Sequence, residues 1–230
     1  MLRKGVDMTT AIVLAAGKST RMGGSVDKAF LSLGNRPVVA WSLLAFERSP
    51  AIDRIVLVVR KEQVLASKAV TKMFGISKLQ EVVAGGAKRQ ASVAAGLAAC
   101  DIDTRIVVIH DAARPCVTSQ LVTEIAEAAK RVPAVTVGRP VTDTVKRCEK
   151  GLTVSATVPR DKLWTVQTPQ AFQAKTLRDA LKALGPKDEV TDECQAVEMS
   201  GGVVKIVENL APNVKITTPE DLQIASALLK

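Results

Sequence analysis

Three basic residues, Lys18, Arg21 and Lys28, lie on or just after a loop of small residues near the start of the chain. The loop reads AAGKSTRMGG over residues 15–24 and follows an apolar run typical of a strand. Backbone N–H groups of such a loop can approach an anion closely, and three cations can neutralise a polyphosphate. The pattern predicts a site for a nucleotide's phosphate chain, although an ordinary strand-to-helix turn with surface lysines has the same composition.

A second candidate is Asp111, which follows the apolar run over residues 105–109. A carboxylate there suits Mg²⁺, which takes one or two carboxylates and completes its shell with phosphate oxygens and water. A helix-capping or turn aspartate is the alternative interpretation. The neighbouring His110 is the chain's single histidine. A lone histidine beside a buried strand is more often structural, so we assign it no role as a general base.

The elements that must position these residues alternate between strand and helix patterns, and this predicts an α/β fold with a doubly wound, mostly parallel sheet. Ligands of such sheets bind beyond the carboxyl ends of the strands, where the loop and Asp111 both lie. The expected strands cover residues 10–15, 52–59, 81–84, 105–109, 134–137 and 203–207. The expected helices cover residues 37–48, 61–74, 89–99, 118–130, 176–184, 191–200 and 219–230.

Residues 141–148 and 152–158 interrupt this alternation with two polar–apolar segments around Glu149-Lys150-Gly151. The pattern predicts a β-hairpin. An isolated hairpin is marginal in water, so we expect residues 140–160 to project as an arm that packs on a second subunit. An exposed edge hairpin on a monomer is the alternative. Apart from the arm, we expect residues 1–230 to form a single domain.

Composition excludes several classes of partner. The formal net charge of +9 favours anionic ligands, either nucleic acid or small phosphorylated molecules. Only 3% of the 230 residues are aromatic and none is tyrosine, so the stacking platforms of single-strand binders are missing. Nor does any apolar run approach the length that spans a membrane. We therefore expect no nucleic acid, no membrane and a cytoplasmic location.

Motifs along the chain resemble a known group of enzymes. The loop is similar to the A-G-x-x-x-R-M-G signature, followed by a lysine, of the sugar-nucleotide pyrophosphorylase and nucleotidyltransferase superfamily. The further motifs together resemble the 2-C-methyl-D-erythritol 4-phosphate cytidylyltransferase family, in order and over nearly the whole chain from Thr10. They are HDAARP at 110–115, DT at 143–144 with KR at 146–147, Arg160 before LW at 163–164, TPQ at 168–170, TDE at 191–193 and NVKITTPED at 213–221.

The resemblance implies that CTP and 2-C-methyl-D-erythritol 4-phosphate react, with Mg²⁺, to give the CDP-alcohol and pyrophosphate in the non-mevalonate isoprenoid pathway. It implies a homodimer in which the arm carries Thr144 and Arg160 to the neighbouring subunit's site. The catalytic cations it implies are Arg21, Lys28 and Lys215, and the metal ligand is Asp111. The nucleotide-binding residues are Ala15, Ala16, Gly17, Lys18, Gly86, Ala87, Arg89 and Ser92. The sugar phosphate would contact Asp111, Arg114, Thr144, Arg160, Thr168 and Thr191.

Two positions depart from the family's usual pattern. Asp27 stands where a proline is common, directly before Lys28, and Ala87 replaces a frequent acidic residue. Because Asp27 places a negative charge beside a triphosphate-binding lysine, we expect its side chain to face away or to pair with Arg21.

Other functions share parts of this pattern. Ribitol-5-phosphate cytidylyltransferase is the closest alternative, and the basic pair Lys146-Arg147 favours the methylerythritol enzyme over it. A nucleotidyltransferase that uses UTP or GTP on a hexose phosphate fits less well. A non-catalytic nucleotide-binding protein of the same fold is the alternative from another class. The presence of Arg21, Lys28, Asp111 and Lys215 together argues against it.

Overall fold

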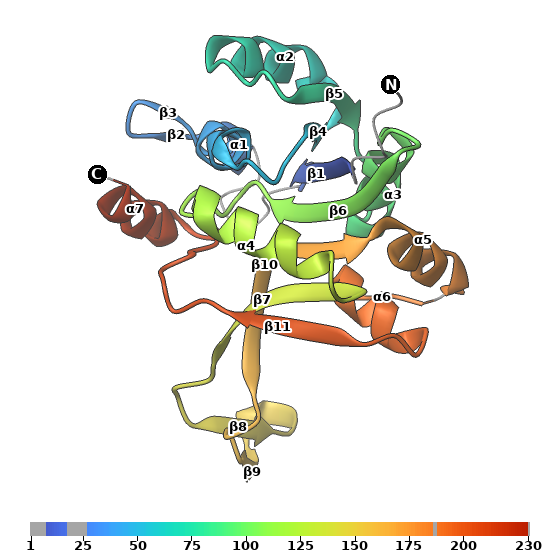
Figure 1. Ribbon diagram of the computed structural model, residues 1–230. Coiled ribbons are helices and arrows are strands. Elements are labelled where there is room, and N and C mark those ends of the chain that lie inside the picture. The colour runs from blue at the N-terminus through green and yellow to red at the C-terminus, as the bar shows by residue number, and fades with distance from the viewer. Residues whose placement is uncertain (1–7, 18–26, 186–187, 230) are drawn as a thin grey trace.

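The computed structural model describes residues 8–17, 27–185 and 188–229, and its centre is a seven-stranded sheet (Figure 1). The strand order is β11-β7-β10-β6-β1-β4-β5. Only β10 runs antiparallel to its neighbours, so the predicted mostly parallel sheet is confirmed. The strands are β1 (Met8–Ala15), β4 (Arg54–Val59), β5 (Leu79–Ala84), β6 (Thr104–Asp111), β7 (Ala134–Pro140), β10 (Trp164–Gln173) and β11 (Val204–Glu208).

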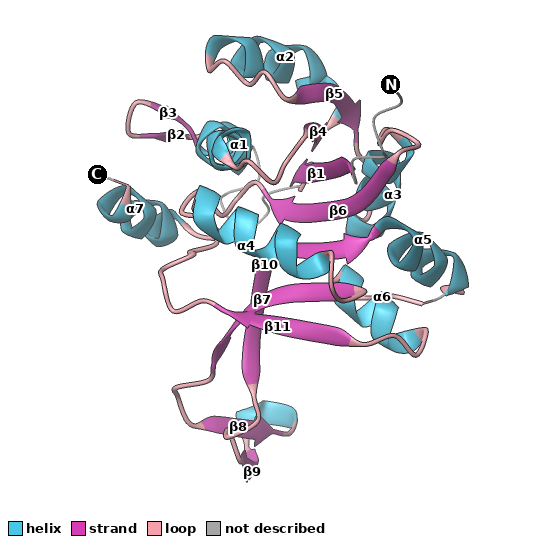
Figure 2. Cartoon of the chain, in the orientation of Figure 1, coloured by secondary structure: helices cyan, strands magenta, loops and turns pink. Residues whose placement is uncertain are grey.

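Helices cover both faces of this sheet, as Figure 2 shows. One face packs against α1 (Val38–Arg48), α2 (Val64–Met73) and α4 (Ser119–Ala129). The other packs against α3 (Arg89–Ala98), α5 (Ala174–Ala183) and α6 (Glu193–Met199). Alternating side chains of β1 supply both cores, Ala11 and Val13 to the first and Ile12 to the second. The central strands β1, β4 and β6 are therefore buried on both sides, which explains their continuous apolar sequences.

Local chemistry places the helices against these faces. Thr118 caps α4, because its side chain accepts a hydrogen bond of 3.1 Å from the backbone N–H of Leu121. Gly96 lets α3 approach β1, since a Cβ there would lie 2.5 Å from Cγ2 of Ile12. Thr118 thus fixes the start of α4, and Gly96 allows α3 to pack closely on β1. None of the helices in the described part of the chain is long and apolar enough to cross a membrane.

Several boundaries differ from the sequence prediction. The sequence prediction assigned no element to residues 164–173, where β10 lies, and this strand contains Pro169, which is unusual within a sheet. A register shift between Gln167 and Gln170 in its pairing with β7 accommodates the proline. The helix predicted over 191–200 is shorter, since Asp192 caps it by accepting from the N–H of Gln195. The helix predicted over 61–74 begins as a 3-10 turn, Lys61–Gln63.

The predicted hairpin is present and projects from the sheet (Figure 1). Its strands, β8 (Val145–Cys148) and β9 (Val154–Val158), pair antiparallel in a sheet of their own. The turn contains Gly151 at a φ of 76°, a conformation that glycine adopts without strain. Strands β7 and β10 lead into and out of this arm.

A third cluster of apolar side chains anchors the end of the chain. Helix α7 (Pro219–Leu228) lies beside the short hairpin of β2 (Ser32–Leu33) and β3 (Arg36–Pro37). Asp221 fixes the start of α7, because its carboxylate accepts a hydrogen bond of 2.8 Å from the backbone N–H of Thr218. The segment that precedes α7 contains Lys215, so this packing helps to fix that lysine relative to the sheet.

Candidate active site

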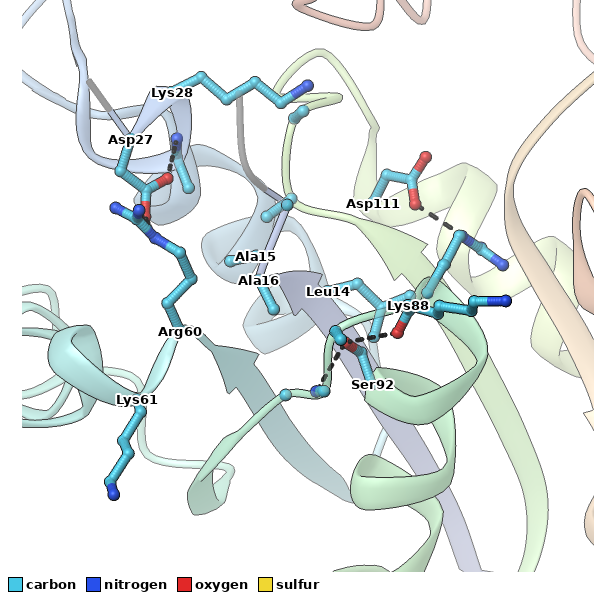
Figure 3. A pocket seen from close by; sticks show the side chains of 18 of the residues that line it. Leu14, Ala15, Ala16, Asp27, Lys28, Arg60, Lys61, Lys88, Ser92 and Asp111 are labelled. Atoms are coloured by element: carbon cyan, nitrogen blue, oxygen red, sulfur yellow. Dashed lines mark hydrogen bonds and ion pairs between the residues drawn. The ribbon is translucent and has the colours of Figure 1, made fainter. Parts of the chain in front are cut away.

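A cavity of about 680 Å³ opens at the carboxyl ends of β1, β4, β5 and β6 (Figure 3). Because these parallel strands end at one edge of the sheet, the residues that follow them meet there. Ten of the predicted site residues line the cavity: Ala15, Ala16, Gly17, Lys28, Gly86, Ala87, Arg89, Ser92, Asp111 and Lys215. The others that line it are Leu14, Asp27, Ala29, Arg60, Lys61, Glu62, Gly85, Lys88, Ala112 and Ala113.

Small residues form one wall of the cavity. Gly85 packs against the end of β1, since a Cβ at this position would lie 2.6 Å from the Cβ of Ala16. Gly86 donates its backbone N–H to Oγ of Ser92 at 3.2 Å, which ties the loop after β5 to α3. Larger side chains at Gly85 or Gly86 would push these segments apart. The wall therefore offers backbone groups to a ligand at short range.

The rim of the cavity is cationic. Six of the residues that line it carry a positive charge and three carry a carboxylate. The six are Lys28, Arg60, Lys61, Lys88, Arg89 and Lys215, and the three are Asp27, Glu62 and Asp111. An excess of positive charge in a concave site attracts anionic ligands. Arg60 and Lys61 were missed in the sequence, although they directly follow β4 and so had to lie at the same sheet edge.

Asp111, the last residue of β6, lies between two of these cations. Its Oδ2 is 2.6 Å from Nζ of Lys215, and its Oδ1 is 3.6 Å from Nη2 of Arg89. Burial alone would raise the pKa of Asp111, but Lys215 and then Arg89 outweigh burial and lower the pKa to about 2. The carboxylate is therefore ionised at neutral pH and can serve as a ligand for a cation.

Arg89 is in turn held by a second carboxylate, that of Glu193 at the start of α6. Nη1 of Arg89 lies 2.5 Å from both carboxylate oxygens of Glu193, whose side chain is 0% exposed. Sequence reasoning gave Glu193 no role, although it belongs to the TDE motif. Its partner lies more than a hundred residues away in the chain, so only the folded structure brings the two together.

Asp27 lines the cavity and pairs with Arg60, another cation of the rim, while the side chain of Lys28 extends in a different direction (Figure 3). Its Oδ2 lies 3.1 Å from Nη2 of Arg60, and its Oδ1 accepts from the N–H of Ala29 at 3.1 Å. Asp27 thereby caps the 3-10 turn Lys28–Phe30. The expected alternative partner, Arg21, lies outside the described residues, as does Lys18. Asp27 thus fixes the backbone that carries Lys28.

The segment that carries Lys215 is fixed to β10 and to the residues that follow β6. The N–H of Ile216 donates to the carbonyl of Ala113 at 2.8 Å. Nδ2 of Asn213 donates to the carbonyl of Thr168 at 2.8 Å, and Nη1 of Arg114 donates to the carbonyl of Asn213 at 2.8 Å. These bonds hold Lys215 opposite Asp111. Arg114, predicted to contact the sugar phosphate, here supports this segment and does not line the cavity.

His110 lies in the core beneath the cavity. It is 0% exposed, its Nε2 is 3.2 Å from the carbonyl of Arg114, and its Nδ1 is 3.2 Å from Oγ1 of Thr168. Burial lowers the pKa of His110 to about 4. A neutral, enclosed imidazole has the properties of a structural histidine. Thr168 is likewise buried, and its hydroxyl also accepts from the N–H of Asp111 at 3.1 Å.

Three further predicted residues lie away from the cavity of their own chain. Thr144 precedes β8, and Arg160 follows β9 and donates to the carbonyl of Thr142. Both are exposed and lie at the arm. Thr191 is also exposed, and its hydroxyl donates to Oε1 of Gln195 at 3.1 Å. The predicted residues thus divide into a group at the cavity and a group outside it.

Comparison with known proteins identifies the family. The family model described as IspD, 2-C-methyl-D-erythritol 4-phosphate cytidylyltransferase, matches residues 9–230. The chain belongs to this family. The cytidylyltransferase of Alkaliphilus metalliredigens is 40% identical over 96% of this chain and 92% of its own length. That of Desulforamulus reducens is 43% identical over 96% of this chain and 95% of its own length.

Solved structures of the cytidylyltransferase family have the same fold. The 4-diphosphocytidyl-2C-methyl-D-erythritol synthase of Anaerococcus prevotii superposes with a TM-score of 0.85 at 31% identity, and the match covers 97% of this chain and 98% of that one. The Thermus thermophilus enzyme gives 0.76 at 34% identity, over 95% of this chain and 97% of that one. The resemblance seen in the motifs is therefore confirmed, and these matches favour the methylerythritol enzyme over the ribitol one.

Proposed function

We infer that the chain transfers CMP from CTP to 2-C-methyl-D-erythritol 4-phosphate, giving 4-diphosphocytidyl-2-C-methyl-D-erythritol and pyrophosphate. Family membership over residues 9–230 supports the reaction. We assign the reaction to this site because Lys215 and Asp111 form an ion pair of 2.6 Å inside a cationic cavity. The pair places a cation and an ionised carboxylate together where a nucleotide's phosphates would bind.

The reaction needs no general base. A phosphate monoester is already anionic near neutral pH and can attack the α-phosphorus directly. The site must therefore position the two substrates and neutralise the charge that develops. We assign this task to Lys28 and Lys215, with Arg21 on the glycine-rich loop as a further expected cation. His110, neutral and enclosed, takes no part in the proposed mechanism.

Asp111 fits a divalent metal such as Mg²⁺. Within the described ranges no group of three or more histidines, cysteines or carboxylates can hold a metal by itself. Mg²⁺ suits such a site, because one carboxylate suffices when phosphate oxygens and water complete its shell. When bound, the ion offsets charge on the α-phosphate and on the departing pyrophosphate. Asp111 would hold it, and Lys215 would keep the carboxylate in place.

The wall of small residues supports the proposal that this part of the cavity binds the nucleotide. Ala15, Ala16 and Gly17 would contact the nucleotide on one side, and the loop with Gly86 and Ala87 on the other. These short side chains leave backbone N–H and C=O groups accessible, and such groups can distinguish an amino from an oxo substituent on a base. Arg89 and Ser92 would complete this part of the site, with Lys18 expected on the loop.

The acceptor half of the site, we propose, is completed by a second copy of the chain within a homodimer. Thr144 and Arg160 lie at the arm, outside the cavity of their own chain. Apolar side chains are exposed on and beside the arm, among them Leu152 at 86% and Val154 at 55%. Burying such surface favours association. Residues 140–160 would then be a dimerisation arm of a single catalytic domain. We also propose a cytoplasmic location for the protein.

The reaction is tested by pyrophosphate release from CTP and Mg²⁺ with 2-C-methyl-D-erythritol 4-phosphate and ribitol 5-phosphate in parallel assays. We expect release with the methylerythritol substrate alone. Release with ribitol 5-phosphate alone would assign the chain to the alternative activity. Absence of release in both assays, with CTP still bound, would favour a non-catalytic nucleotide-binding protein.

A further inference from the structure

We propose that Glu193 is a positioning residue that keeps Arg89 from closing onto Asp111, and so leaves Asp111 available to a divalent cation. The inference rests on the proposed function, because it takes Asp111 as the metal ligand. It assigns Glu193 a task that neither the sequence nor the cavity lining indicated. Glu193 acts through Arg89 and does not itself line the cavity.

The four side chains involved alternate in charge, from Glu193 to Arg89, Asp111 and Lys215. Arg89 is bound much more closely to Glu193 than to Asp111. Its Nη1 lies 2.5 Å from both oxygens of Glu193, whereas its Nη2 lies 3.6 Å from Oδ1 of Asp111. The longer distance exceeds that of a charge-assisted hydrogen bond, which is 2.7–2.9 Å. Arg89 therefore forms a loose ion pair with Asp111 that is too long for a hydrogen bond.

Burial explains why Glu193 retains the arginine. The Glu193 side chain is 0% exposed, and a buried carboxylate is costly unless it is paired. The start of α6 is tied to the sheet, because Asp192, its N-cap, accepts a hydrogen bond of 2.7 Å from Gln170 on β10. The carboxylate of Glu193 is thus a fixed anchor for the guanidinium.

Neutralising Glu193 would change which cations contact Asp111. Arg89 would lose its stronger partner, and the ion-pair partner left to it among the described residues is Asp111, 3.6 Å away. Asp111 would then bond two cations, Arg89 at Oδ1 and Lys215 at Oδ2. Both oxygens that a metal could use would be occupied, so a divalent cation would have to displace an arginine.

The test measures how strongly the metal assists nucleotide binding, without requiring turnover. The affinity for CTP is measured by isothermal titration calorimetry with Mg²⁺ and with EDTA, and the ratio of the two dissociation constants is the metal coupling. Glu193→Gln is compared with Glu198→Gln, which makes the same change at an exposed position on the same helix. We expect the coupling to fall about tenfold in Glu193→Gln and to be unchanged in Glu198→Gln.

A double variant distinguishes positioning from a loss of structure. Arg89→Gln/Glu193→Gln replaces the ion pair by two amides that can bond to each other and removes the competitor of the metal. We expect the metal coupling to return in this variant, even if CTP binds more weakly overall. Coupling that stays low in the double variant, or that is unaffected in Glu193→Gln, contradicts the inference. If Glu193→Gln does not fold, Glu193→Asp replaces it, with a smaller loss expected.

Asp111→Asn separates this inference from the proposed function. Loss of the coupling in Asp111→Asn together with retention in Glu193→Gln would refute the role of Glu193 alone. Coupling retained in Asp111→Asn would refute the metal role of Asp111, and the inference about Glu193 with it.

Discussion

The cavity at the sheet edge holds ten of the predicted residues, whereas the arm that carries Thr144 and Arg160 borders no part of it. The cavity residues are fixed by buried contacts, such as the 2.6 Å pair of Lys215 with Asp111 and the bonds of Glu193 to Arg89. Thr144 and Arg160 are exposed, and the two-stranded sheet of the arm beside them has no hydrophobic core of its own.

The proposed site is divided in the same way, between a buried cavity and an exposed arm. In the proposed division a single chain would form the nucleotide half, because four parallel strands bring the cavity residues to one edge of the sheet. The acceptor half would depend on the arm, whose two strands form a separate sheet. Substitutions in the two regions should therefore fail in different ways, one by losing transition-state stabilisation and the other by losing the acceptor.

The largest effect on activity is expected in the cavity, from Lys28→Ala and Lys215→Ala. Each change removes a cation that neutralises the transferring phosphate, so turnover should fall roughly a hundredfold or more. Steady-state kinetics with Lys205→Ala as the control, an exposed lysine on β11, checks this. Turnover within a few-fold of the unaltered chain in either variant would refute the role of that lysine.

The next effect is expected from the arm, in Arg160→Ala. Loss of a cation that holds the acceptor phosphate should lower kcat/KM for the acceptor roughly tenfold to a hundredfold while the affinity for CTP stays the same. Lys162→Ala, an exposed neighbour, serves as the control. A weaker affinity for CTP in Arg160→Ala would show that the two halves are not separate.

A smaller effect is expected where Asp27 supports Lys28. Asp27 and Glu62 both bind Arg60, but the first carboxylate is 4% exposed and the second 63%. Asp27→Asn should lower the free energy of unfolding by about 2 kcal/mol, because a charged hydrogen bond is lost in a buried place. Glu62→Gln should change it by less than about 1 kcal/mol. Urea unfolding of both variants measures the difference, and equal values would contradict this account.

We expect the smallest effect on catalysis from His110, because it takes no part in the proposed mechanism. Its protonation should instead change the free energy of unfolding. Because the pKa of His110 is about 4 in the folded chain and 6.5 ordinarily, the unfolded chain binds the extra proton between these values. Stability should therefore decrease as the pH falls through that window, by about 3 kcal/mol in total. NMR of the single histidine measures its pKa directly, and a midpoint near pH 6.5 would contradict this prediction.

Much of the fold was predictable because its signals are local. The apolar runs that became β1, β4 and β6 contain enough β-branched and apolar residues to be read directly, and Thr118 marks the start of α4. Strand β10 was not predictable, because its proline is tolerated only through a register shift against β7. Single-sequence patterns do not contain such pairings.

The same distinction between local signals and long-range contacts decides which site residues could be predicted. Asp111 and the glycine-rich loop were found because they follow strands, and the same rule would have found Arg60 and Lys61. The role of Glu193 and the pairing of Asp27 with Arg60 could not be found in this way. Their contacts join segments 104 and 33 residues apart, and only packing decides which cation a buried carboxylate meets.

The most direct test of the divided site is complementation between two variants, each impaired in one half of the site. Lys28→Ala damages the nucleotide half and Arg160→Ala the acceptor half. In a mixed dimer, the Arg160→Ala chain keeps an intact cavity and receives an intact arm from its partner. Co-expression should therefore restore about a quarter of the normal activity per site, because half of the dimers are mixed and each contains one intact site. No recovery in mixed dimers whose assembly is confirmed would contradict the account, since Arg160 would then serve its own chain.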